Sequence, residues 1–404
     1  MADKDIYLLM SSRILRSVVA GFLAVIIGLY FLKIGLNDFQ IGILFGIGAF
    51  ATPLLSFIFS IYADRYGRKL FLLIALAFLP IAILILLFTT NFALLALSSA
   101  LGGFGIAGGL VGGGVGAVVA PMQTALLAEK SKKEDLTRIY SLFTTFSTYS
   151  GAFGALLANI RNYNLLFILG LILSLGSFAV VIPVKEERQR VEHREDNNGD
   201  EKEVNKRDMD VIKKFTFTGI LNGVSQGLIV PFIPIIFKTF YGLTQAEIGD
   251  IVFIGGIVSA SVMFLTPMMN EKLGFVKFII STRMIGAVLV LIFPFLKIPL
   301  IAAVDYILFT TFRVFALPAQ QALMMVLVSG KRRATASGTN QTARLLPSAL
   351  STVLSGFLLS LAVAIPFALS FFVNVANAFL YYKFFWDMPE AKQKRRISAR
   401  TGFD

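Results

Sequence analysis

The sequence has no cysteine and only one histidine among its 404 residues. Without cysteine, the chain can form no disulfide and no thiolate metal site, and it has no thiol nucleophile. The histidine, His193, lies in a hydrophilic stretch, which excludes a histidine proton relay or a polyhistidine metal site within the apolar sequence. We therefore expect neither a metal nor a cofactor.

Charged residues are also scarce, at 15% of the chain, whereas 56% of the residues are hydrophobic. A soluble domain has about 25% charged residues, and its core could not hide this much apolar surface. Apolar stretches of about twenty residues recur from end to end, which is the length that a helix needs to cross a bilayer core of about 30 Å. The composition predicts an all-α integral membrane protein.

Twelve apolar stretches are predicted to be transmembrane helices. The first begins near Tyr7 and is long enough to span the membrane, which favours a helix over a removable signal peptide. The predicted helices cover residues 9–32, 39–60, 69–89, 92–128, 138–159, 163–184, 213–237, 245–268, 275–296, 299–328, 335–359 and 362–386.

The net charge of +13 follows the predicted topology. The termini and the connections on their side are strongly basic, and the opposite side has only Lys33, Arg161, Lys238 and Lys297. Basic loops stay on the cytoplasmic side of a membrane, so we expect a multi-pass protein, in the cell membrane, with both termini in the cytoplasm. The expected partners are a small solute, the lipid bilayer and possible coupling protons; nucleic acid is not expected.

An internal repeat divides the chain into two halves. The segment GLNDFQIG at Gly35–Gly42 recurs as GLTQAEIG at Gly242–Gly249, an offset of 207 residues, whereas APMQTALL at 120–127 matches LPAQQALM at 317–324, an offset of 197. The first half therefore has ten extra residues, which we assign to a glycine-rich run. The predicted parts are a first six-helix bundle at 1–184, a charged cytoplasmic linker at 185–212, a second six-helix bundle at 213–388 and a basic cytoplasmic tail at 389–404.

Each half has a predicted capping box after its first short turn. Asn37 with Gln40, and Thr244 with Glu247, are spaced so that side chains can satisfy the free backbone donors at the start of a helix. This pattern favours a structural role for Glu247 over a coupling role.

The glycine-rich run lies in the fourth helix and includes the spacing GxGxxG at Gly103, Gly105 and Gly108. A dinucleotide site needs a preceding strand, and this run lies in apolar sequence that would be about 55 Å long as one helix. We expect a break, a bend or an extension past the membrane. The pairs Gly105 with Gly109 and Gly112 with Gly116 favour close helix packing over backbone exposed to a substrate.

The connection after the second helix reads SIYADRYGRK, at Ser60–Lys69. It resembles the loop motif of the major facilitator superfamily, Gly-x-x-x-Asp-Arg-x-Gly-Arg-Lys, and departs from it at Ser60. The resemblance implies twelve helices in two bundles, and a latch that holds the bundles together in the outward-facing state; the alternative is a basic topogenic loop without a gate. The candidate gating residues are Asp64, Arg65, Gly67, Arg68, Lys69, Glu129 and Arg344.

Ionisable residues in transmembrane helices are costly and are therefore functional candidates. The resemblance implies that helices one, four, seven and ten surround the central cavity, which favours Arg16, Asp305 and Arg313 and makes Arg283 structural. For polar residues on the same helices, two interpretations are open: binding of a solute, or a hydrogen bond to a neighbouring helix. The candidate substrate-binding residues are Arg16, Gln123, Asn222, Gln226, Arg313 and Gln320, and the candidate proton-coupling residues are Asp305 and Asp250.

These features predict a secondary active transporter that works by alternating access as a monomer, and not an enzyme, because no cluster of catalytic residues is visible. The loop motif resembles those of drug and metabolite exporters, which favours proton-coupled efflux of drug-like or amphipathic solutes. Efflux is the leading hypothesis, and a carrier of organic anions, which five arginines against one deep aspartate favour, is the alternative. A non-transporting membrane sensor is a third hypothesis.

Overall fold

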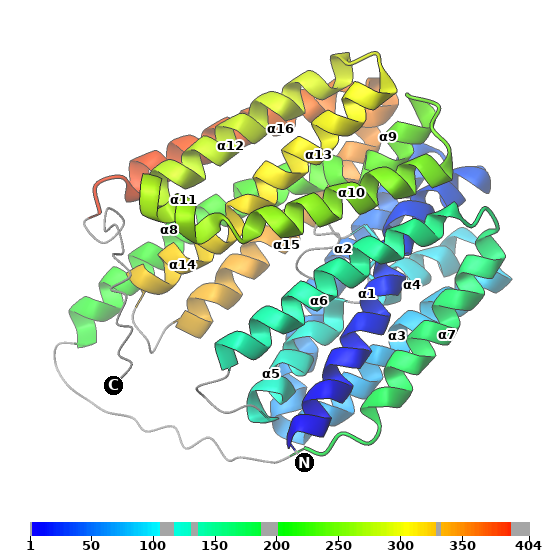
Figure 1. Ribbon diagram of the computed structural model, residues 1–404, viewed down its shortest axis with the longest axis horizontal. Helices are drawn as coiled ribbons and strands as arrows, with labels where there is room; N and C mark the ends of the chain where they lie inside the picture. Colours follow the sequence, from blue (N-terminus) through cyan, green and yellow to red (C-terminus); the bar gives the residue numbers. More distant parts are fainter. Residues whose placement is uncertain (1, 106–116, 131–135, 187–200, 329–332, 389–404) are drawn as a thin grey trace, which may run out of the picture.

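The computed structural model describes residues 2–105, 117–130, 136–186, 201–328 and 333–388, and every regular element in these ranges is a helix (Figure 1). The first half contains α1 (Ala2–Lys33), α2 (Asp38–Tyr66), α3 (Arg68–Phe88), α4 (Phe92–Gly102), α5 (Ala120–Lys130), α6 (Leu136–Leu156) and α7 (Tyr163–Val181), with 3-10 turns η1 (Ala117–Val119) and η2 (Leu157–Asn159).

The second half repeats this plan. It contains α8 (Glu201–Ile229), α9 (Ile233–Thr239), α10 (Gln245–Met263), α11 (Thr266–Leu273), α12 (Phe275–Ile292), α13 (Pro299–Phe315), α14 (Leu317–Leu327), α15 (Arg333–Leu361) and α16 (Ala364–Phe385), with 3-10 turns η3 (Val230–Phe232) and η4 (Phe293–Phe295).

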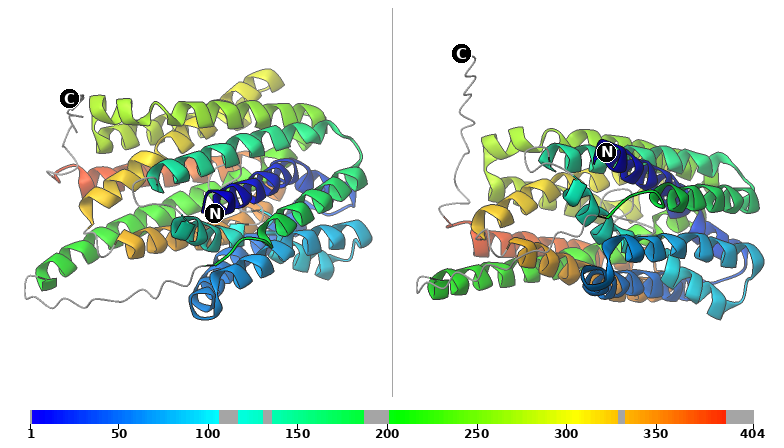
Figure 2. Two further views of the ribbon diagram at one scale, coloured as in Figure 1. Left: turned by 60° about the horizontal axis from the view of Figure 1, so that its bottom comes forward. Right: turned by 90° about the horizontal axis from the view of Figure 1, so that it is seen from below.

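Several of these helices join into longer segments, and the result is the predicted all-α membrane protein of twelve transmembrane helices in two six-helix bundles. The joined segments are α8 with α9, α10 with α11, and α13 with α14; α4 and α5 are the described parts of the fourth segment. Ten segments in the described ranges are long and apolar enough to cross a membrane. The other two are the broken α4–α5 segment and α6, in which serine and threonine are frequent. The long helices run roughly along one direction (Figure 2).

Both predicted capping boxes are confirmed. The backbone N–H of Gln40 donates to Asn37 Oδ1 over 2.9 Å, and the backbone N–H of Asn37 donates to Gln40 Oε1 over 3.1 Å. At the matching turn, the backbone N–H of Thr244 donates to Glu247 Oε2 over 2.7 Å. The repeat is therefore preserved at the level of individual hydrogen bonds.

The fourth segment breaks, as the glycine run predicts. Helix α4 ends at Gly102, and Gly103 follows in the left-handed conformation with φ of 66°. Gly105 also has positive φ, and a Cβ atom there would lie 2.4 Å from Phe45 Cβ on α2. Gly105 thus lies in a turn and lets α2 approach closely; its predicted partner Gly109, and Gly108, Gly112 and Gly116, lie outside the described residues.

The predicted linker is helical in its second part. Helix α8 begins at Glu201, twelve residues before the predicted helix, and Lys214 pairs with Asp210 one turn earlier over 2.7 Å. Val211 and Ile212 are buried in an apolar cluster of the second half. Lysine and glutamate are good helix formers, and this apolar contact stabilises a helix that composition alone does not reveal.

Glycines bring helices into backbone contact at matching places in the two halves. A Cβ atom at Gly21 on α1 would lie 2.0 Å from the carbonyl oxygen of Gly151 on α6. A Cβ atom at Gly223 on α8 would lie 2.0 Å from the carbonyl oxygen of Arg344 on α15. Each bundle therefore depends on a side-chain-free position in its first helix.

The halves contact each other near one end of the molecule. We name this the turn end, because it contains the short turns at Gly35 and Gly242; the opposite end, where α1 begins and α16 ends, is the terminal end. Gly42 on α2 packs against Gly356 on α15, and Gly249 on α10 packs against Ala155 on α6. Gln245 Nε2 also donates across the halves to the carbonyl oxygens of Ala158 and Ile160, over 2.8 and 2.9 Å.

The buried apolar residues also differ between the turn end and the terminal end. One large cluster at the turn end contains residues of both halves, among them Phe31, Phe45, Phe232 and Phe237. Two other clusters lie toward the terminal end, and each belongs to one half only. The two bundles thus share a core at the turn end and have separate cores at the terminal end.

Candidate functional site

The predicted Arg16 and Gln123 lie together inside the first half. Arg16 is 3% exposed, and its Nη2 donates to Gln123 Oε1 over 3.3 Å. Gln123 is fully buried, and its Nε2 donates to the carbonyl oxygen of Leu9 over 2.9 Å. Arg16 also lines a narrow gap between α1, α3, η1 and α7 that is too small for a water molecule, so it faces the interior of its own bundle.

Arg13, one turn earlier on α1, is bound to α6. Its Nε donates to Ser147 Oγ over 2.8 Å, and its guanidinium lies 5.5 Å from the centre of the Phe143 ring. Ser17 and Ser147 share a further hydrogen bond of 2.8 Å. The arginines of the first half therefore bind polar groups of neighbouring helices.

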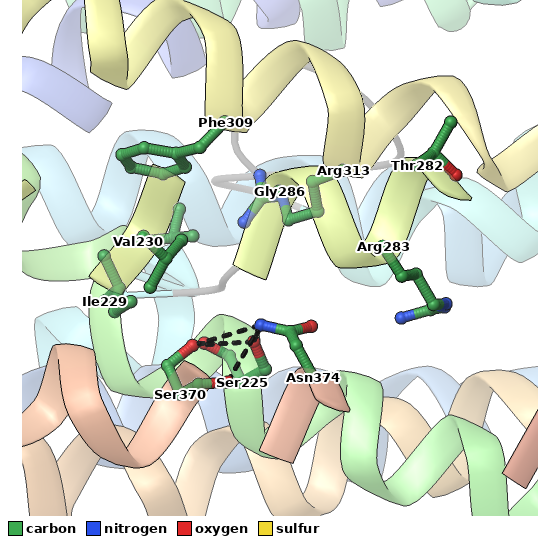
Figure 3. A pocket seen from close by; sticks show the side chains of 11 residues that line it. Ser225, Ile229, Val230, Thr282, Arg283, Gly286, Phe309, Arg313, Ser370 and Asn374 are labelled. Atoms are coloured by element: carbon green, nitrogen blue, oxygen red, sulfur yellow. Dashed lines mark hydrogen bonds between the residues drawn. The ribbon is translucent and has the colours of Figure 1, made fainter. Parts of the chain in front are cut away.

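A cavity in the second half contains two arginines (Figure 3). It lies between α8, η3, α12, α13 and α16, on the counterparts of the helices around Arg16, and its inner space is about 30 Å³, which is room for about two water molecules. Arg313 reaches it from α13 and Arg283 from α12. Its lining consists of Ser225, Ile229, Val230, Thr282, Arg283, Gly286, Val290, Phe309, Arg313, Ser370 and Asn374.

Hydrogen-bond donors of both arginines are unsatisfied. Arg313 Nη1 and Arg283 Nε are enclosed and have no hydrogen-bond partner within the described part of the chain. The Arg283 guanidinium lies 5.2 Å from the centre of the Tyr381 ring. An unsatisfied buried donor costs about 1–3 kcal/mol, and a buried charge costs more. The structure also brings Arg283, which was predicted to be only structural, into one cavity with Arg313.

Asn222 and Gln226, one turn apart on α8, are both buried and bind each other: Gln226 Nε2 donates to Asn222 Oδ1 over 3.1 Å. Gln320 on α14 has an enclosed Nε2 without a partner among the described residues. Arg344 on α15 is half-buried and lies where that helix touches α8 at Gly223. Arg344 and Arg313 are within electrostatic range of each other.

The two aspartates predicted to couple protons lie in different surroundings. Asp305 on α13 is 7% exposed, and its Oδ2 has no hydrogen-bond partner among the described residues. Asp250 on α10 is exposed and accepts a hydrogen bond of 3.2 Å from Asn159 Nδ2 of the other half. Asp305 is thus a buried acid, whereas Asp250 contributes to the contact between the halves at the turn end.

The loop between α2 and α3 is anchored to other helix ends of the first half. The Arg68 guanidinium forms an ion pair with Glu129 of α5, and Lys69 Nζ donates to the carbonyl oxygen of Ile182 over 2.7 Å. Burial raises the pKa of Glu129, although the Arg68 guanidinium opposes this effect. Gly67 has φ of 121°. The side chains of Asp64 and Arg65 lie outside the described residues.

Glu186, which follows α7, holds this loop and was not predicted from the sequence. Its carboxylate accepts the backbone N–H of Arg68 over 2.7 Å and that of Lys69 over 3.2 Å. It therefore caps the N-terminus of α3, where a negative charge is favourable. Its position among many charges after the sixth predicted helix offered no sequence signal. The cluster of Ser225, Ser370 and Asn374 was missed too, since its members are far apart in the sequence.

No group of three or more histidine, aspartate or glutamate side chains that could hold a metal ion occurs in the described ranges. The chemistry that the described residues offer is instead that of binding: buried guanidiniums, amides and hydroxyls in transmembrane helices, between two bundles that share one end. Arg13, Arg283, Arg313 and Arg344 form no ion pair in the part of the chain that the structure describes.

Comparison with known proteins identifies this architecture. The family model described as Major Facilitator Superfamily matches residues 9–352 and 215–402. A point mutant of the nucleoside transporter NupG has a TM-score of 0.75 at 14% identity, over 94% of this chain and 100% of that chain. A D-xylose-proton symporter has a TM-score of 0.73 at 14% identity, over 96% and 98%. No curated protein matches the chain by sequence.

A third similar structure is a bacterial homologue of the human lysosomal transporter Spinster, in an inward-facing, unoccupied conformation. Its TM-score is 0.70 at 14% identity, over 95% of each chain. At such identities, these three structures establish the fold and leave the solute open.

Proposed function

The chain belongs to the major facilitator superfamily and is a secondary transporter rather than an enzyme, and from this premise we propose that it carries a small organic anion. The observation that carries this proposal is the charge imbalance in the transmembrane helices. Four arginines there form no ion pair among the described residues, and Asp305 is the deep acid. A desolvated guanidinium pairs best with a carboxylate or a phosphate.

We place the transport path between the halves, along α8, α14 and α15. Arg344 is the proposed anion ligand, because it is half-buried and its backbone packs against Gly223 on α8. Gly223 follows Asn222 directly in the sequence. Asn222, Gln226 and Gln320 would supply neutral donors and acceptors. Arg16 and Gln123, which bind each other, would stabilise the first bundle instead.

We further propose that the bundles move about the turn end. The shared core there and the separate cores at the terminal end fit a conformation open toward the terminal end. The basic terminal-side loops support a cytoplasmic position of that end in a cell-membrane protein, so this conformation would be inward-facing. The latch of the outward-facing state would involve Asp64, Arg65, Gly67, Arg68, Lys69 and Glu129; the protein is proposed to act as a monomer.

Solute counterflow in proteoliposomes tests the anion proposal. Vesicles loaded with unlabelled organic anions or cations are diluted into trace amounts of each labelled solute. We expect counterflow of anions and none of cations. Arg344→Met should lower anion counterflow by about tenfold to a hundredfold, since a charge-assisted hydrogen bond contributes about 1.5–3 kcal/mol, whereas the exposed control Lys238→Met should retain it. Exchange of cations alone would refute the proposal.

Proton-coupled efflux of amphipathic solutes is the second candidate, and the buried, unpartnered Oδ2 of Asp305 favours it. A carboxylate in apolar surroundings can exchange a proton in each transport cycle. Under this hypothesis, a pH gradient should drive solute against its concentration gradient, and Asp305→Asn should abolish the drive. A counterflow rate that does not depend on pH and is unchanged in Asp305→Asn would rule out proton coupling through this residue.

A further inference from the structure

The arginine-lined cavity of the second half lies inside one bundle. Its lining comes from α8, η3, α12, α13 and α16, whereas the close contacts between the bundles are made by α2 with α15 and by α6 with α10. Figure 3 shows the side chains of Arg313 and Arg283 on two sides of this space. An ion in the cavity would therefore be enclosed by the second bundle rather than held between the two halves.

The cavity holds positive charge that no acidic group offsets. Its lining residues include no carboxylate. The groups that act electrostatically on Arg313 are Tyr306 and Arg344, and the group that acts on Arg283 is Tyr381. Arg344 is itself a cation, and a tyrosine is neutral at physiological pH. Because a charge buried without a counterion is unfavourable, Arg283 and Arg313 favour the binding of an anion.

Each of the two arginines also has a hydrogen-bond donor to offer. Arg283 is 7% exposed, and its Nε is enclosed without a hydrogen-bond partner in the described ranges; the same holds for Arg313 Nη1. Polar side chains of the opposite wall already bind each other: Asn374 Nδ2 donates to Ser225 Oγ over 2.7 Å, and Ser225 and Ser370 share a hydrogen bond of 2.8 Å (Figure 3). What the cavity lacks is therefore an acceptor for guanidinium N–H groups.

The size of the cavity restricts the kind of anion. Its inner space of about 30 Å³ has room for about two water molecules. A chloride ion is only slightly larger than one water molecule and fits, whereas sulfate, phosphate and any carboxylate with a hydrocarbon body are larger than two. Two water molecules would also fit and would accept the N–H groups, but they would leave both charges without a counterion. A monatomic halide supplies the acceptor and the negative charge together.

We propose that this cavity is a halide site, in which Arg283 and Arg313 hold one chloride ion as the counterion of the second bundle. The site is separate from the transport path and does not require that the transported solute be an anion. The matching place in the first bundle is different: Arg16 there donates to Gln123, and the gap beside it is too small for a water molecule. The chloride ion is therefore expected in the second bundle and not at the matching place in the first.

Thermal unfolding of the full-length protein in detergent tests this site. Tm is measured while sodium chloride, bromide or acetate replaces sodium gluconate at constant ionic strength and pH. We expect a saturable rise in Tm with chloride and with bromide, and none with the larger acetate. Absence of a saturable rise with chloride, or an equal rise with acetate, would overturn the proposal. Because transport is not measured, a failure of the anion carrier in proteoliposomes leaves this result independent.

A variant of one arginine assigns the effect to the cavity. Arg283→Met should raise the chloride concentration that gives half of the rise in Tm at least tenfold. The control Arg13→Met, in the first bundle, should respond to chloride as the wild type does. An equal response of the two variants would show a general salt effect and would overturn the proposal.

A second variant keeps the test decisive if Arg283→Met fails to fold. A Cβ atom at Gly286, which lines the cavity, would have its nearest neighbours at 3.8 and 3.9 Å, so Gly286→Val is accepted without a backbone clash. It retains both arginines, narrows the space and should abolish the rise in Tm with chloride. Gly176→Val, in the first bundle, is the matched control, since its Cβ atom would have one neighbour at 3.6 Å. An equal rise with chloride in Gly286→Val and Gly176→Val would also overturn the proposal.

Discussion

The two bundles have the same frame and different polar interiors. Each begins a helix with a capping box after its first turn and brings its first and fifth transmembrane helices together at a glycine. In the first bundle, Arg16 is bonded to Gln123. In the second, Arg283 and Arg313 line a larger cavity with unsatisfied donors. The backbone plan can thus be repeated while the buried charges take different roles.

The largest expected effect tests the shared frame. Gly223→Val and Gly21→Val should both prevent stable folding, because a Cβ atom would lie 2.0 Å from a backbone oxygen that cannot move without the helix. Gly255→Ala is the matched control, since its Cβ atom would have ordinary contacts from 3.5 Å. Gel filtration of the purified variants measures the folded fraction. A well-folded Gly223→Val would show that close contact between α8 and α15 is dispensable.

The next largest effect, on stability, tests the difference between the polar interiors of the two bundles. Arg16→Met should lower stability by about 1–3 kcal/mol, because it leaves the buried Gln123 Oε1 without its donor. Arg313→Met removes a buried charge with an unsatisfied nitrogen, so stability without added anion should stay equal or rise. Thermal unfolding in an anion-poor buffer compares them. If Arg313→Met is the more destabilised of the two, the proposed contrast is wrong.

A smaller effect is expected in the loops at the terminal end. Glu186→Gln should destabilise the protein by about 1–2 kcal/mol, because Glu186 accepts two backbone N–H groups at the start of α3. The corresponding turn of the second half begins α12 at Gly274 without a side-chain cap from that residue. Glu271→Gln, on the exposed end of α11, is the matched control and should be neutral within about 0.5 kcal/mol. Equal unfolding temperatures for the two variants would contradict the capping role.

The smallest effects should be the same in both halves. Asn37→Ala and Thr244→Ala each remove one capping box, and each should cost about 0.5–1 kcal/mol at these exposed turns. Chemical or thermal unfolding of the two variants measures the costs. Costs that differ by more than about 1 kcal/mol would show that the turns are not equivalent.

The sequence predicted the features that depend on neighbouring residues. The caps at Asn37 and Thr244 follow from local spacing, and the break after Gly102 follows from a local run of glycines. Twelve segments and two halves follow from the length of the apolar runs and from the repeat. Such features are fixed by local backbone geometry and by the thickness of the bilayer.

The sequence could not predict features that depend on how a helix is rotated about its own axis. The long apolar stretches identified Arg16 and Arg313 as intramembrane charges but left open that both face the interior of their own bundle. The cap from Glu186 joins residues more than a hundred positions apart in the sequence. The charged composition before residue 213 predicts a linker rather than a helix. Helix α8 nevertheless begins at Glu201, because tertiary contacts of Val211 and Ile212 stabilise it.

The bundles share one core at the turn end and have separate cores at the terminal end, and we propose that they move as two bodies during transport. Because the chain has no cysteine, spin labels can be placed at will on exposed positions: Phe88 and Leu300 for the turn end, Tyr7 and Met209 for the terminal end. Electron–electron double resonance then measures each distance between the halves, with and without the solute that gives the fastest counterflow. We expect the solute to shorten the terminal-end distance and to lengthen the turn-end distance. Unchanged distances, or a change of both in the same direction, would rule out this movement of the bundles.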